Sequence, residues 1–201
     1  MRLIKEKWLM IVAALAVAIV MLLLLYNPYT GPDFIAEPVQ IALIEPEEIT
    51  YQGREGPVVL ECLAEYQITA AVKSIHDYST DYSSQVSPRD VVLAWGNLND
   101  SEIAKQIRYS QSGRWYYFRF ENGTTVDQAY IQEHSANVHL IPADDKIKSQ
   151  LRHIRRNDTV QLEGYLVRVH FESGSCTSSL SRDDAGDGSC EILYVLKASI
   201  N

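Results

Sequence analysis

The sequence lacks the cysteine content and the positive charge that mark two large classes of protein. It has 201 residues but only three cysteines, too few for a small scaffold held together by disulfide bonds. Its 18 Lys and Arg residues are outnumbered by 26 Asp and Glu residues, which leaves a formal net charge of −8. Proteins that bind nucleic acids neutralise phosphates with clustered cations, so this acidic balance argues against a nucleic-acid partner. The hydrophobic content of 46% is ordinary for a globular protein and excludes collagen and a disordered tail.

The sequence also lacks the short motifs of several enzyme families. It contains no P-loop, no G-x-S-x-G elbow, no H-E-x-x-H helix and no C-x-x-C pair. An EF-hand calcium loop counted from Asp183 fails, because its third position is Ala185 and its twelfth is Tyr194. We therefore predict no metal ion and no cofactor, and we expect binding rather than catalysis.

What the sequence does contain is one long apolar run near its N-terminus. Residues 8–26 carry no charge, and a helix of this length would span roughly 28 Å, close to the hydrocarbon core of a bilayer. Arg2, Lys5 and Lys7 precede the run, so the positive-inside rule predicts a cytoplasmic N-terminus and an exported remainder. A cleaved signal peptide is the alternative, but its apolar region is usually only about 7–15 residues long.

The charge divides unevenly between the predicted segments. Residues 1–26 hold three basic groups and one acidic group, whereas the remainder holds 15 basic and 25 acidic groups. We predict a cytoplasmic stub and transmembrane anchor at 1–26, a Pro-rich acidic linker at 27–57, and an exported domain at 58–201. The alternative for the linker is that it packs along the edge of the domain. The anchor helix makes the membrane one partner, and a protein partner with a basic surface would suit the acidic domain.

Hydrophobic periodicity predicts an α+β domain with a mostly antiparallel sheet or a partly open OB-like barrel, and a few short helices. Gly164, inside a long predicted strand, indicates a bend or bulge, as at the corner of a barrel. The predicted strands are 65–75, 114–120, 138–141, 159–171 and 190–197. The predicted helices are 91–95 after a Ser-Pro start, a short one capped at Asn99-Asp100, and one capped at Asp144 or Asp145.

The densest group of potentially catalytic side chains lies in the segment HSANVH at 134–139. His134, Asn137 and His139 are candidates for a general acid–base site or a metal site. On a strand, Asn137 and His139 would share one face and His134 would not. The alternative is structural, with one histidine capping a turn and Asn137 fixing the backbone.

Two further groups are candidates for ligand binding. Arg114 would clamp an anionic group, and Tyr116 beside it would suit a sugar or a base; core packing of the aromatic strand is the alternative. Arg182 and Asp183 lie in a polar loop, where an ion pair within a solvated hairpin is the alternative interpretation.

Two cysteines, Cys176 and Cys190, flank this polar loop near its ends. In an oxidising compartment they would form a disulfide bond that closes the loop. Pairing of Cys62 with either of them, or three free thiols, are the alternatives.

Five segments of the chain form a recognisable set: SPxD leading to WG (87–96), SQSxRWY (110–116), HSANxHLIPA (134–143), GYLV (164–167), and SSLxRxD leading to CE (178–191). Together they resemble a family of membrane-anchored proteins of Gram-negative proteobacteria to which no activity is assigned. The resemblance implies an inner-membrane anchor and a periplasmic domain, and it transfers no catalytic residue.

These observations favour a non-enzymatic module for binding or complex assembly. The alternative is a small periplasmic hydrolase or phosphodiesterase that uses the segment 134–139 and nearby arginines. That alternative requires the named side chains to converge on one cavity.

Overall fold

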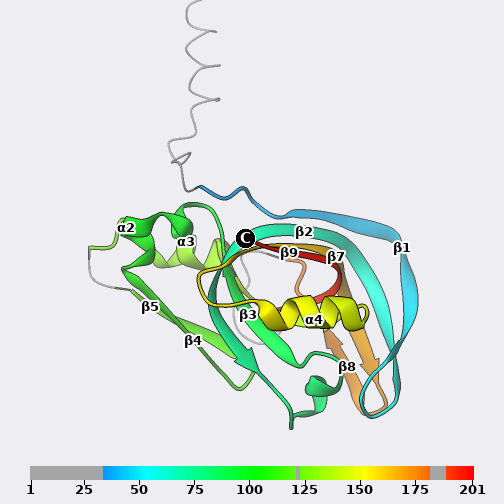
Figure 1. The fold of residues 1–201 in the computed structure, drawn as a ribbon. Coiled ribbons are helices and arrows are strands. Elements are labelled where there is room, and N and C mark those ends of the chain that lie inside the picture. Colours follow the sequence, from blue (N-terminus) through cyan, green and yellow to red (C-terminus); the bar gives the residue numbers. More distant parts are fainter. Residues whose placement is uncertain (1–33, 121–122, 182–188) are drawn as a thin grey trace, which may run out of the picture. The chain divides into compact units, whose positions relative to one another are not determined.

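A ring of five β-strands forms the centre of the domain, and pairing between β2 and β7 closes it (Figure 1). The computed structural model describes residues 34–120, 123–181 and 189–201, all within one unit, Asp33–Asn201. Neighbouring strands of the ring are antiparallel except β6 and β9, which are parallel. In spatial order the ring comprises β2 (Pro57–Asp77), β3 (Arg89–Ala94), β6 (Ser135–Pro142), β9 (Glu191–Ile200) and β7 (Thr159–Phe171).

The remaining elements are attached to this ring. β1 (Val39–Gln52) pairs with the first half of β2, and β8 (Gly174–Thr177) pairs with the end of β7. β4 (Ile107–Ser112) and β5 (Trp115–Phe120) form a separate hairpin, which Figure 1 shows beside α2 and α3, on the opposite side from β1 and β8. The helices are η1 (Tyr82–Gln85), η2 (Asn97–Asn99), α2 (Ser101–Ala104), α3 (Gln128–Glu133) and α4 (Asp145–His153), where η denotes a 3₁₀ helix. The prediction of a sheet-rich domain with a few short helices is confirmed.

The main hydrophobic core lies where alternate residues of the ring strands meet α4. Val138 and Leu140 on β6 and Leu162 on β7 are fully buried in this core, as the period of two predicts. The α4 side chains Ile147 and Leu151 pack against them, and the helix lies across the ring strands in Figure 1. α4 therefore fixes the connection between β6 and β7.

The predicted helix at 91–95 is wrong, because residues 91–94 belong to the central strand β3 and Trp95 directly follows it. Ser87-Pro88 resembles a helix start, but Pro88 lies directly before the strand. Val91 and Val92 are β-branched, and five of the six β3 residues are buried between β2 and β6. Burial on both faces of a central strand outweighs a local capping signal.

The predicted linker needs a correction over its second half. Residues 39–52 form β1, which pairs with β2 and packs Leu43 and Ile49 onto a second core. Ile35 also forms a β-bridge with Gly96. From about residue 34 onward, the segment therefore packs along the edge of the domain, which was the alternative to a free linker.

The predicted membrane anchor at 8–26 lies outside the described residues. Over the part of the chain that the structure describes, no helix has the length and apolar character needed to cross a membrane.

Candidate functional site

Strand register places the key polar side chains on one face of β3 and β6. His139 on β6 lies directly opposite Asp90 on β3 in the antiparallel ladder. Asn137 precedes His139 by two residues and shares its face, whereas Val138 and Leu140 point into the core. The prediction that Asn137 and His139 share a strand face is therefore confirmed.

The β4–β5 hairpin covers this face and delivers Arg114 to it. Its turn has positive φ at both central residues, Gly113 at 58° and Arg114 at 73°, as a type I′ turn requires. A side chain is seldom found in this conformation, so Arg114 must be held by its contacts. Its backbone N–H donates to the hydroxyl of Tyr78 at 3.0 Å, and its guanidinium lies 3.8 Å from the centre of the same ring.

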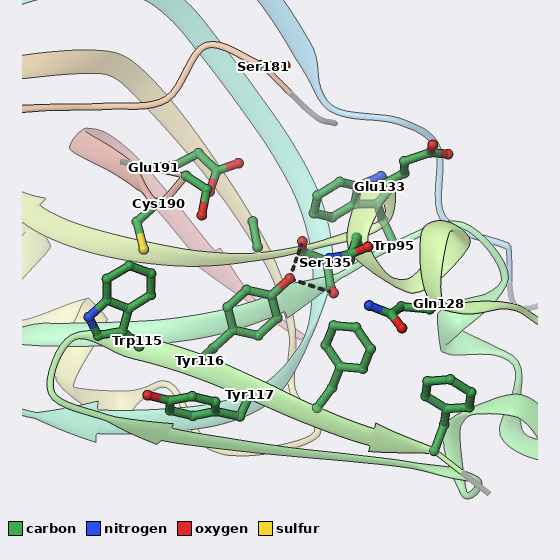
Figure 2. Close-up of a pocket in the computed structure, with 15 residues that line it drawn as sticks. Trp95, Trp115, Tyr116, Tyr117, Gln128, Glu133, Ser135, Ser181, Cys190 and Glu191 are labelled. Atoms are coloured by element: carbon green, nitrogen blue, oxygen red, sulfur yellow. Dashed lines mark hydrogen bonds between the residues drawn. The ribbon is translucent and has the colours of Figure 1, made fainter. Parts of the chain in front are cut away.

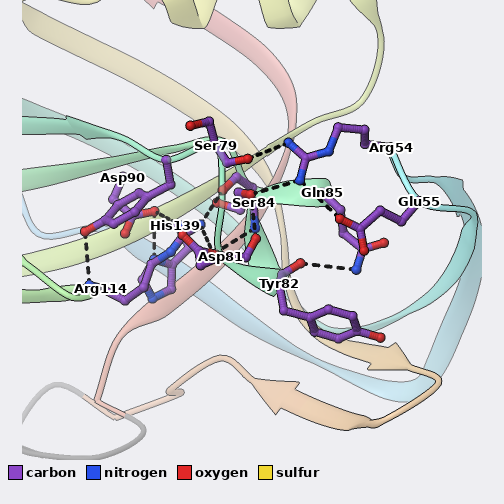
Figure 3. A network of polar contacts seen from close by, with 12 residues as sticks. Arg54, Glu55, Ser79, Asp81, Tyr82, Ser84, Gln85, Asp90, Arg114 and His139 are labelled. Carbon is purple, nitrogen blue, oxygen red and sulfur yellow. Dashed lines mark hydrogen bonds and ion pairs between the residues drawn. The ribbon is translucent and has the colours of Figure 1, made fainter.

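Arg114 is held between two carboxylates (Figure 3). One guanidinium nitrogen lies 2.7 Å from Asp90 and the other lies 2.7 Å from Asp81, while Ser87 accepts a further bond through its backbone oxygen at 3.0 Å. The prediction that Arg114 clamps an external anion finds no support, because its charge is already paired within the chain. Its observed contacts fasten the hairpin to the ring.

His139 shares the carboxylate of Asp90 with Arg114. Its Nδ1 lies 2.9 Å from Asp90 Oδ1, an ion-pair distance, and the Asp90 side chain is fully buried. Burial alone would lower the pKa of His139, but contacts with Asp90 and with the Cys190 thiol outweigh it and raise the pKa to about 9. At neutral pH His139 is therefore a buried cation.

The charge on His139 predicts a pH-dependent stability. Because the folded-state pKa is above the ordinary value, the contribution is complete below about pH 6.5 and disappears as pH rises through about 9. We expect the free energy of unfolding to fall across this window by on the order of 3 kcal/mol, since one pKa unit corresponds to about 1.4 kcal/mol. Urea unfolding of the full chain in detergent micelles, followed by circular dichroism, measures this. His139→Gln should abolish the change, and a flat wild-type profile would contradict the assignment.

Asn137 connects the hairpin to the thiol of Cys190. Its amide oxygen accepts from Gln111 Nε2 at 2.8 Å, and its Nδ2 donates to the backbone oxygen of Arg114 at 2.9 Å. The same Nδ2 lies 3.7 Å from Cys190 Sγ. Cys190 directly precedes β9, which runs parallel to β6 from the pair Val138 and Glu191 onward. The thiol is therefore on the same face as Asn137 and His139.

The three cysteines are unbonded in this structure, so the predicted disulfide between Cys176 and Cys190 is not formed. Cys176 lies on β8 and is exposed, whereas Cys190 is half-buried against Asn137. Cys62 is buried, and burial raises its pKa to about 11. Spacing in the sequence did not reveal that the Cys190 thiol lies beside Asn137 and the backbone oxygen of Arg114.

His134 does not join this group. It follows α3, where its ring stacks on Tyr130 at 3.8 Å between centroids and its Nε2 lies 3.0 Å from Glu37. Glu37 also accepts from the indole nitrogen of Trp95 at 2.7 Å. These contacts attach the chain before β1 to the domain, which agrees with the structural alternative for this histidine.

A groove lined by aromatic side chains lies between β5 and β6 (Figure 2). Rings of Tyr116, Phe118 and Phe120, at alternate positions of β5, follow one another at 6.2 Å. The Tyr116 hydroxyl donates to the backbone oxygen of Ser135 on β6 at 3.2 Å. This bond holds β5 against the ring of β-strands. The groove has a volume of about 330 Å³. Tyr116, predicted as a ligand-binding residue, lies in it.

The polar lining of this groove consists of amides, carboxylates and hydroxyls. Among the described residues it contains no Lys and no Arg. Its amide and carboxylate residues are Gln128, Gln132, Glu133 and Glu191.

A second cavity, of about 380 Å³, adjoins the groove. Trp115 and Cys190 line both cavities, and His139 and Arg114 line only the second. Its other walls come from the connection between β2 and β3 and from β7, β8 and β9. The apolar wall residues, besides Trp115, are Val86, Val169, Phe171 and Ile192.

The structure thus brings together Asn137, His139 and Arg114, and leaves His134 elsewhere. Arg182 and Asp183 lie outside the described residues. Asp90 was missed because its segment resembles a helix start. An acidic residue between apolar ones, in a run rich in β-branched residues, is the signal that would have drawn attention to it.

Comparison with known proteins adds no family. No family model matches the chain, and no curated protein and no solved structure matches it. Within the described ranges, no group of three or more His, Cys, Asp and Glu side chains is arranged to hold a metal ion.

Proposed function

We propose that this is a single-pass protein of the bacterial inner membrane, with a cytoplasmic N-terminus and an acidic periplasmic domain that binds an uncharged oligosaccharide. The binding site is the aromatic groove between β5 and β6. The observation that carries the proposal is the position of this groove on an OB-like ring.

The ring has the connectivity of an OB-fold. Five strands close through β2 and β7, β6 and β9 are parallel, and α4 connects β6 to β7. OB-folds bind oligonucleotides and oligosaccharides on the face of their second and third strands, between the loops that join strands one to two and four to five. The corresponding strands are β3 and β6. The groove is lined by the start of β6, by Ser181 and Ser189 from the connection between β8 and β9, and by the aromatic strand β5, which is inserted in the chain between β3 and β6.

The chemistry of the lining favours a sugar over a nucleic acid. Aromatic faces pack against the apolar faces of sugar rings, and amides and carboxylates bind hydroxyl groups. The described lining offers no cation to phosphates, and the chain outside residues 1–26 carries 25 acidic against 15 basic groups.

The test is binding of two uncharged probes, an N-acetylglucosamine tetramer and maltotetraose, to the full chain in detergent micelles by calorimetry. Phe120→Ala should weaken binding about tenfold, because it removes one ring of the aromatic row. Phe120 is 40% exposed, so the fold should tolerate its removal. Tyr82→Ala is the matched control, since Tyr82 is 44% exposed and lies outside the groove. No binding of either probe, or equal weakening by the two variants, would contradict the proposal.

A further inference from the structure

Three residues form a group on one face of the sheet that sugar binding does not require. Asp90 on β3 faces His139 on β6, and Cys190 directly precedes β9 on the other side of β6. The β9 residue opposite His139 is Ile192, so Cys190 lies two residues earlier in the chain, beside Asn137.

The imidazole lies beside the carboxylate and shares a cavity with the thiol. Its Nδ1 lies 2.9 Å from Asp90 Oδ1, an ion-pair distance without hydrogen-bond geometry, and Cys190 lines the second cavity together with His139. Asp90 Oδ2 is buried and has no hydrogen-bond partner among the described residues, whereas Oδ1 is shared by His139 and Arg114. A histidine paired with a buried acid and placed in one cavity with a thiol is the arrangement from which nucleophilic cysteines are activated.

The thiol is accessible from two sides. Cys190 lines both the aromatic groove and the second cavity, and it is half-buried rather than enclosed. Five large apolar side chains line the second cavity, which suits an apolar acyl group, whereas the groove suits a polar one.

We propose that Cys190 is the nucleophile of a thiol esterase centre, with His139 as its acid–base partner and Asp90 as a positioning residue. Its substrate class is an ester with an apolar acyl part, which the second cavity accepts. The alcohol part lies toward the groove. That the alcohol part is a sugar hydroxyl rests on the proposed function. The reactivity of the thiol is independent of the proposed function.

The reaction needs only the ester and water. The Cys190 sulfur attacks the carbonyl carbon, so a C–S bond forms and the C–O bond to the alcohol breaks. The thiol proton, carried by His139, passes to the departing alcohol oxygen. Water then attacks the thioester while His139 accepts a proton from it. The C–S bond breaks with its electron pair staying on sulfur, the carboxylic acid leaves, and the proton taken from water remains on His139, which restores the starting state.

The first test is acylation of the reduced full chain in detergent micelles by p-nitrophenyl hexanoate. We expect a burst of p-nitrophenolate and one hexanoyl group per chain, located on Cys190 by peptide mass spectrometry. Cys190→Ala should abolish the burst. Cys176, an exposed thiol of the same cavity, should stay unacylated in the same peptide map. Hexanoyl transfer to Cys176, or no burst, would overturn the proposal, whatever the outcome of the sugar-binding test.

The second test asks whether His139 activates the thiol. His139→Gln should lower the acylation rate at neutral pH about 100-fold and leave a rate that rises with pH as for an ordinary thiol, a readout that a purely structural role would not change. Arg114 still pairs with Asp90 in this variant, so the fold should persist.

In the wild-type chain, Cys176 is an internal standard: iodoacetamide at neutral pH should label the half-buried Cys190 faster than the exposed Cys176. Faster labelling of Cys176, or equal acylation rates in wild type and His139→Gln, would overturn the activation.

Discussion

Asp90→Ala is expected to lower the free energy of unfolding by about 3–5 kcal/mol, the range for removing one partner of a buried ion pair. Asp90 is fully buried, and it is the carboxylate that Arg114 and His139 share at 2.7 and 2.9 Å. Without it, two cations would remain on the covered face of the sheet, with only the partly exposed Asp81 to compensate Arg114. The hairpin would lose the contact that fastens its turn, including the left-handed Arg114.

Urea unfolding of the full chain in detergent micelles, followed by circular dichroism, measures this loss. Asp77→Ala is the matched control: Asp77 also pairs with an arginine, Arg89 at 2.6 Å, but its side chain is 64% exposed. We expect this variant to lose less than about 1 kcal/mol, because solvent screens exposed pairs. If the two variants lost similar amounts of unfolding free energy, the Asp90 ion pairs would be no more buried than the exposed Asp77 pair, which would contradict the structure.

The fold was predictable where local pattern and tertiary environment agree. Thr159–Phe171 alternates, with one change of phase at Leu166 and Val167, and it forms β7 with the predicted bounds. Asp144 caps α4 through a bond from the Ile147 N–H at 2.7 Å, as the sequence indicated. β3 and β1 were misjudged because their environment decides them. β3 is buried from both sides, and β1 is a mostly exposed edge strand whose acidic residues resemble a linker.

The site was predictable only in part, for a related reason. Asn137 and His139 share a face because of the period of two, which a sequence displays directly. Asp90 and Cys190 reach that face through pairings between β3, β6 and β9, and the residues concerned are far apart in the chain. A cysteine pair around a loop suggests a disulfide bond by spacing alone, whereas the side-chain direction of Cys190 is set by the parallel pairing of β9 with β6.

Gly164 marks the point where β7 passes closest to the backbone of β9. It pairs with Tyr66 on β2 and with Val195 on β9, and the β7–β9 register shifts between Glu163 and Gly164. The bulge that the sequence predicted at this glycine is confirmed. An added Cβ would lie 1.8 Å from the backbone oxygen of Tyr194, far inside van der Waals contact.

Gly164→Ala is therefore expected to cost about 3 kcal/mol of unfolding free energy, at the upper end of the usual range for overpacking. The obstructing atom belongs to the backbone of a ring strand, so relief requires β7 and β9 to separate and to weaken the ladder that closes the ring. Gly113→Ala is the control, because its added Cβ meets nothing within 4 Å and only its φ of 58° opposes the change. That variant should lose about 1 kcal/mol.

The measurement is urea unfolding of the full chain together with amide hydrogen exchange, in which Gly164→Ala should speed exchange selectively in β7 and β9. Wild-type stability in Gly164→Ala would mean that the two backbones do not approach as closely as the bulge requires.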